Sequence, residues 1–125
     1  MKLHFAAITF LTMFAGACAD VNDDSAVTSL SKSEQQSLCE EFVTTFCTHA
    51  ADSSFCTKFA TNPKCAEAVA ANRVTTQCSD TAGTSVDTIT VGAVRECATA
   101  TDEASLVQKC LSNGGGCMFD VVEGN

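Results

Sequence analysis

The chain has 125 residues, with nine cysteines and 15 Asp and Glu against 7 Lys and Arg, so its formal net charge is −8 at neutral pH. This length provides one domain, and the negative charge disfavours binding to nucleic acid or to anionic lipid surfaces. With eight Phe and no Trp or Tyr the apolar core is thin, and we expect covalent cross-links to support it.

Residues 1–17 have the layout of a cleaved secretory signal peptide. Lys2 provides a positive start, an apolar run covers residues 3–14, and small residues occupy 15–17, directly before Cys18. A membrane-spanning helix needs about 20 mostly apolar residues, but the chain turns polar soon after Cys18. The segment therefore predicts export, with cleavage at or next to Cys18.

The run Ala15-Gly16-Ala17-Cys18 resembles the lipobox of bacterial lipoproteins, in which small residues precede a cysteine that is diacylated and becomes the mature N-terminus. It departs from that pattern at Ala15, where Leu, Val or Ile is usual. Ala17-Cys18-Ala19 also fits an ordinary A-x-A cleavage site, which would remove Cys18 and release a soluble protein. We predict a flexible polar spacer over 18–32, and such slack favours lipidation at Cys18.

A disulfide-stapled helical domain is expected over residues 33–123. Ser31 and Glu34 have the spacing of a capping box, and apolar residues from Leu38 to Cys47 follow at helical spacing. Shorter helices are expected after caps at Asp52 or Ser53, at Asn62 before Pro63, at Thr90 and at Asp102, the last ending at Asn113-Gly114. The fold class is therefore mainly α, a small bundle of four to five short helices, with one short strand or extended loop near 85–91.

Eight cysteines follow Cys18, and we expect all of them to form four disulfides in a monomer. Residues eight apart on a helix are separated by about 12 Å of rise, so Cys39 and Cys47 must each reach a different element. The 105 possible connectivities leave the pairs open. Structural zinc sites favour cysteines two to four residues apart, a spacing that is missing here, so no metal is expected. The eight are Cys39, Cys47, Cys56, Cys65, Cys78, Cys97, Cys110 and Cys117.

Catalytic chemistry is not indicated, and neither an enzyme nor a cofactor is expected. The mature part contains one histidine, His49, at the end of the first predicted helix, where a solvated cation is the ordinary interpretation. The glycines at 114–116 lack the lysine of a phosphate-binding loop, so we interpret them as a hinge that lets Cys117 fold back.

The whole arrangement is similar to the small cysteine-rich lipoproteins predicted in myxobacteria. It combines a short signal with Ala-Cys, a polar spacer, a helix reading Leu-Ser-x-x-x-Gln-x-x-Leu-Cys and dispersed cysteines ending near Gly-Gly-Cys. This resemblance implies a domain anchored to the bacterial cell envelope through Cys18. We expect it to act as a binding or structural module, and the longest loop, from Asp80 to Thr90, is the candidate contact for an unknown protein.

Secreted elicitins, which are helical, rich in Thr and Ser and disulfide-bonded, are a looser likeness and carry six cysteines. That alternative predicts a secreted soluble carrier of a small apolar ligand. Its requirement is an enclosed cavity of about 300 Å³ or more. The residues expected to border that cavity are Phe42, Phe46, Phe55 and Phe59.

Overall fold

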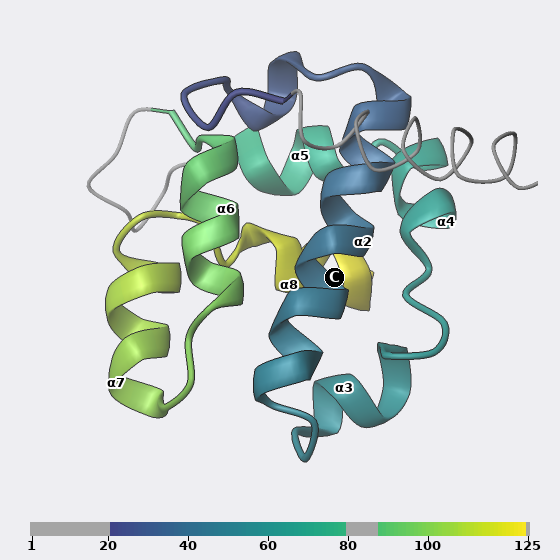
Figure 1. Ribbon diagram of the computed structural model, residues 1–125. Coiled ribbons are helices and arrows are strands. Elements are labelled where there is room, and N and C mark those ends of the chain that lie inside the picture. The colour runs from purple at the N-terminus through teal and green to yellow at the C-terminus, as the bar shows by residue number, and fades with distance from the viewer. Residues whose placement is uncertain (1–20, 80–87, 125) are drawn as a thin grey trace, which may run out of the picture.

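The computed structural model describes residues 21–79 and 88–124, and this part of the chain is mainly helical (Figure 1). It confirms the predicted class, a small helical bundle stapled by disulfides. Seven α-helices are described, which is more than the four or five expected. The elements are η1 (Val27–Ser29), α2 (Lys32–His49), α3 (Ser54–Phe59), α4 (Cys65–Ala70), α5 (Arg73–Ser79), α6 (Val91–Ala98), α7 (Glu103–Leu106), the π-helical turn η2 (Val107–Leu111) and α8 (Cys117–Glu123).

Helix α2 is the longest described element, and helices α3, α4, α6 and α8 pack against it (Figure 1). Its predicted capping box is present: the Glu34 N–H donates to Ser31 Oγ at 3.2 Å, and the Ser31 N–H donates to Glu34 Oε1 at 2.9 Å. These two bonds satisfy backbone donors that the first helical turn leaves free. The predicted apolar stripe is buried from Leu38 to Phe46, and Cys47 at its end is half-buried.

Three of the other predicted caps are also present. Ser53 accepts a hydrogen bond from the Cys56 N–H at 3.2 Å, Thr90 from the Ala93 N–H at 3.2 Å, and Asp102 from the Ser105 N–H at 2.8 Å.

The predicted start of a helix at Asn62-Pro63 is wrong. Lys64 has a φ of 58°, in the left-handed region, which interrupts the chain between Pro63 and the first residue of α4, Cys65. The helix therefore begins without a side-chain cap, at the residue that is disulfide-bonded to α2.

The flexible spacer predicted over 18–32 is wrong for its described part, residues 21–32. Val21 and Val27 are buried, the Val27 N–H donates to the Ile89 carbonyl at 3.0 Å, and Arg95 pairs with Asp23 at 2.6 Å. Two isolated valines show no periodicity, yet they are enough to pack this segment against α5 and α6. Residues 18–20 lie outside the described part.

No strand forms among the described residues near the predicted strand of 85–91. Thr90 makes one isolated antiparallel bridge with Ala26, and Val91 begins α6. Residues 85–87 lie outside the described residues. This single bridge, in place of a paired strand, joins the N-terminal segment to the residue that precedes α6.

Four disulfides pair all eight cysteines of the domain, and each bond joins two different helical elements. The two bonds of α2 go to different partners, as the spacing along that helix requires. The other two bonds tie the C-terminal half of the bundle together. The pairs are Cys39–Cys65 (α2 to α4), Cys47–Cys56 (α2 to α3), Cys78–Cys117 (α5 to α8) and Cys97–Cys110 (α6 to η2).

Candidate functional site

The four phenylalanines expected to line a ligand cavity pack against one another. The ring centroids of Phe46 and Phe55 are 5.8 Å apart, and those of Phe55 and Phe59 are 5.2 Å apart. Phe119 of α8 fills the space between the helices, with its ring centred 5.0 Å from both Phe42 and Phe46 in edge-to-face geometry. Such contacts stabilise a packed core. Within residues 21–79 and 88–124 this cluster is therefore packed core.

An apolar pocket of about 330 Å³ opens on another side of the molecule, between η2 and α8. Phe119 belongs to both places, because its half-buried ring contacts the core and also lines the pocket. Val107 is 51% exposed and Leu111 is 64% exposed, and both lie on the pocket wall. The complete lining is Leu106, Val107, Cys110, Leu111, Gly116, Phe119 and Asp120.

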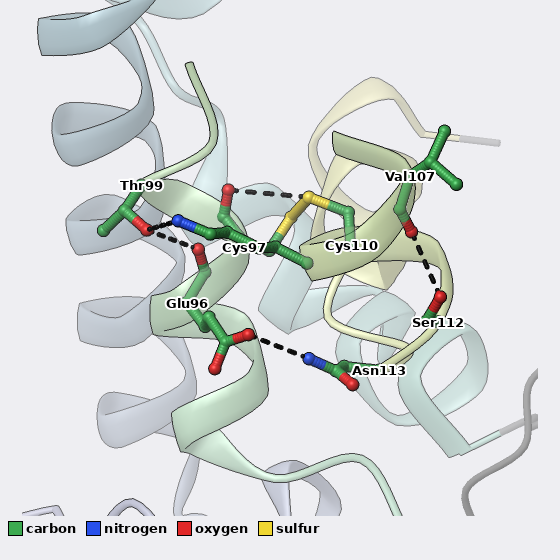
Figure 2. Close-up of a disulfide and its surroundings, with 8 residues drawn as sticks. Glu96, Cys97, Thr99, Val107, Cys110, Ser112 and Asn113 are labelled. Atoms are coloured by element: carbon green, nitrogen blue, oxygen red, sulfur yellow. Dashed lines mark hydrogen bonds between the residues drawn. A yellow bond between two sulfur atoms is a disulfide. The ribbon is translucent and has the colours of Figure 1, made fainter. Parts of the chain in front are cut away.

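The wall formed by η2 departs from the predicted helical geometry. The Ser112 N–H donates to the Val107 carbonyl at 3.1 Å, a bond from residue i+5 to residue i. Ser112 Oγ donates to the same carbonyl at 3.3 Å, as Figure 2 shows. A turn closed in this way holds one residue more than an α-helical turn, and π-helical turns are frequent at functional sites. Of the apolar residues in this stretch, Cys110 is buried, Leu106 is half-buried and Val107 is exposed.

Helix α6 holds the η2 wall in place through a covalent bond and polar contacts. The disulfide Cys97–Cys110 joins the two elements, and Asn113 Nδ2 donates to Glu96 Oε1 at 3.1 Å (Figure 2). Lys109 Nζ donates to Thr99 Oγ1 at 3.4 Å. The pocket wall is thus fastened to α6 and to Thr99, the residue that follows it.

Asp120 is the one charged side chain among the described residues that line the pocket. Cys110 also lines it but is disulfide-bonded to Cys97 and does not ionise. No described residue donates a hydrogen bond to the Asp120 carboxylate or forms an ion pair with it. An apolar wall with one unpaired carboxylate suits a ligand that is itself apolar with a positive group.

A second, more open depression of about 410 Å³ is polar. Two of its acidic groups already have partners, since Asp23 pairs with Arg95 and Glu96 accepts from Asn113. Of the predicted contact loop from 80 to 90, Thr88 and Thr90 line this depression, and residues 80–87 lie outside the described part. We therefore place the candidate site at the apolar pocket.

The other residues considered from the sequence do not form a catalytic or metal-binding cluster within the described part of the chain. His49 is exposed at the end of α2. Within residues 21–79 and 88–124 no group of three or more His, Cys, Asp or Glu side chains is placed to hold a metal ion. The described helices also include none with the length and apolarity to cross a membrane. Cys18, the predicted lipidation site, lies outside the described residues.

Comparison of the chain with models of protein families, with curated proteins and with solved structures finds no match.

The sequence contained part of the signal for this pocket. Leu106, Val107 and Leu111 are the large apolar residues of their segment, but an α-helical pattern assigns such residues to the core. Phe119 follows a glycine run, and no helix was expected after it, although Met118, Val121 and Val122 have helical spacing around Phe119.

Proposed function

We propose that this protein is an exported binding module, held at a bacterial cell envelope by lipid on Cys18, and that its apolar pocket between η2 and α8 receives the ligand. The observation that carries the binding role is the pocket itself, with Val107 and Leu111 exposed at its wall. Soluble proteins rarely leave large aliphatic side chains together at a hollow surface without a use for them.

Export is supported by the signal layout of residues 1–17 and by the four disulfides. Disulfides persist in oxidising compartments outside the cytoplasm. Since most of the apolar core lies between stapled helices, the fold depends on such a compartment.

Anchoring at Cys18 is tested by the variant Cys18→Ala. The change leaves small residues around the cleavage site but removes the thiol that would carry lipid. We expect the native protein to fractionate with the envelope and to need detergent for release, whereas the variant is found in the soluble fraction. Recovery of the native protein in the soluble fraction would favour the secreted soluble carrier instead.

Binding at the pocket is tested with a neutral apolar probe, 1-octanol, added to the isotopically labelled, oxidised protein. We expect saturable chemical-shift changes confined to Leu106, Leu111 and Phe119, and weaker binding in Leu111→Ser. The matched control is Gln108→Ser, which changes an exposed residue of the same turn that does not line the pocket. Equal binding by both variants would place the probe elsewhere and overturn the assignment.

A further inference from the structure

We propose that the pocket between η2 and α8 selects a small amphiphilic amine, with the apolar body inside the pocket and the ammonium group beside Asp120. This inference rests on the proposed binding function and names its ligand class.

The apolar body is indicated by the walls of the pocket. Leu106, Val107 and Leu111 form one side and the half-buried ring of Phe119 belongs to the other. Filling the pocket removes aliphatic surface from water, including that of the two most exposed large apolar side chains in the described residues. Burial of such surface is worth about 25 cal/mol per Å².

The size of the pocket argues for a small molecule instead of a protein segment. Its volume of about 330 Å³ is near the lower end of ordinary ligand pockets. A helix or strand of a partner protein needs an extended groove, and the lining residues here come from two short segments, 106–111 and 116–120.

The positive group is indicated by the Asp120 carboxylate. It lines the pocket, no described residue pairs with it, and an ammonium offers three donors to its oxygens. The nearest cation in sequence on the facing wall, Lys109, is engaged with Thr99. The net charge of −8 adds a field that attracts cations and repels anions.

The test compares three probes with the same alkyl chain: octylammonium, 1-octanol and octanoate. Each is titrated into the labelled, oxidised protein, and the shifts of Leu106, Leu111 and Phe119 report occupation of the pocket. We expect octylammonium to bind most tightly and octanoate most weakly. Added salt should reduce this difference, because it screens the exposed charge of Asp120.

The decisive variant is Asp120→Asn, with Glu123→Gln as its matched control. Both remove one carboxylate from α8, but Glu123 does not line the pocket. We expect Asp120→Asn to weaken octylammonium binding about two- to fivefold, the range of an exposed ion pair, and to leave 1-octanol binding unchanged. In Glu123→Gln the preference for octylammonium should persist.

The outcomes separate this inference from the function on which it rests. If the three probes bind at the pocket with equal affinity, the binding function stands and selection of an amine is overturned. If Glu123→Gln removes the preference as fully as Asp120→Asn, the selectivity comes from net charge, and the inference is likewise overturned. If no probe shifts the pocket residues, both proposals fail.

Discussion

Gly115 lies where the chain passes so close to α6 that a side chain has no room. A Cβ atom built on Gly115 would lie 2.2 Å from the Ala93 carbonyl oxygen and 3.1 Å from Cys97 Cβ. The neighbouring atom is backbone, which cannot rotate away. The close approach lets the glycine run bring Cys117 back to its disulfide partner on α5.

We therefore predict that Gly115→Ala lowers the free energy of unfolding by about 1–3 kcal/mol, the usual cost of overpacking. Thermal unfolding of the oxidised protein measures this. The matched control is Gly116→Ala, where the added atom would lie 3.3 Å from Cys110 Cβ, a contact that small shifts relieve. A midpoint for Gly115→Ala equal to that of Gly116→Ala would show that α6 can move away.

Asp102 gives the pocket wall a pH dependence. The hydrogen bond from the Ser105 N–H, and after it the Ser105 side chain, holds the pKa of Asp102 below its ordinary value of 3.8. Because the folded-state pKa is depressed, this contribution to stability is present above pH 3.8 and is lost as the pH falls through the lower folded value.

We expect the Ser105 amide to lose protection from hydrogen exchange on acidification below pH 3.8. Asp102→Asn serves as the control, because Asn caps a helix equally well without titrating. The same loss in Asp102→Asn would assign the effect to other carboxylates.

Single residues with local signals were predictable from the sequence, and those that depend on tertiary contact were not. The caps at Ser31, Thr90 and Asp102 were predicted, and Ser53 was one of two candidates, because a cap is a property of neighbouring residues. The same kind of signal at Asn62 was wrong, because Lys64 takes a left-handed conformation. Glycine is needed at 115 because of the nearby Ala93 backbone. Since Ala93 is distant in sequence, no local pattern predicts this need.

At the scale of elements, the disulfide between α6 and η2 holds the pocket wall, whereas the bond between α2 and α3 lies outside it. The two bonds close loops of similar length, with sequence separations of 13 for Cys97–Cys110 and 9 for Cys47–Cys56. From the chain-entropy relation each bond stabilises the protein by about 3 kcal/mol. Removing one or the other therefore gives two variants of similar stability, of which the Cys97 and Cys110 variant also shortens one lining side chain, that of Cys110.

We predict that replacing Cys97 and Cys110 by Ala abolishes binding of 1-octanol, while replacing Cys47 and Cys56 by Ala leaves it nearly intact. Both double variants should lose similar global stability in denaturant unfolding. Titration of each variant under conditions where it is folded measures the difference. Retention of binding without Cys97–Cys110 would contradict a pocket held by that bond.

Helices were easier to predict from the sequence where their apolar repeat is long. Helix α2 has 18 residues, a complete capping box and an apolar stripe. Helices α5 and α8 have seven residues each, and their stability comes from packing and from the bond between Cys78 and Cys117. The π-helical turn η2 was missed because its sequence is compatible with an α-helix, and the pocket was missed with it.

At the scale of the whole molecule, the packed N-terminal segment shortens the distance between any lipid on Cys18 and the fold. Val21 is already buried against the bundle, so three residue steps separate it from Cys18. An extended chain of that length spans at most about 11 Å. Lipid on Cys18 would keep the end of the molecule that bears residues 21–31 close to the membrane, with α3 at the opposite end (Figure 1).

This orientation is measurable because the chain contains no Trp. Single-Trp variants at Asp24, in the N-terminal segment, and at Lys58, on α3, place a fluorophore at each end of the anchored protein. We expect headgroup-labelled quencher lipids to quench the Trp at position 24 strongly and the Trp at position 58 weakly. Equal quenching would mean that the domain tumbles freely on its anchor.

Intact mass spectrometry of the natively exported protein tests lipid anchoring and disulfide formation together. One spectrum reports the first residue, the added acyl mass and the oxidation state of the cysteines. We expect a chain that starts at Cys18, carries lipid on it, and lacks the eight hydrogens removed by the four disulfides. A chain without acyl mass that starts at Asp20 would contradict the anchor, and free thiols among the eight domain cysteines would contradict the stapled fold.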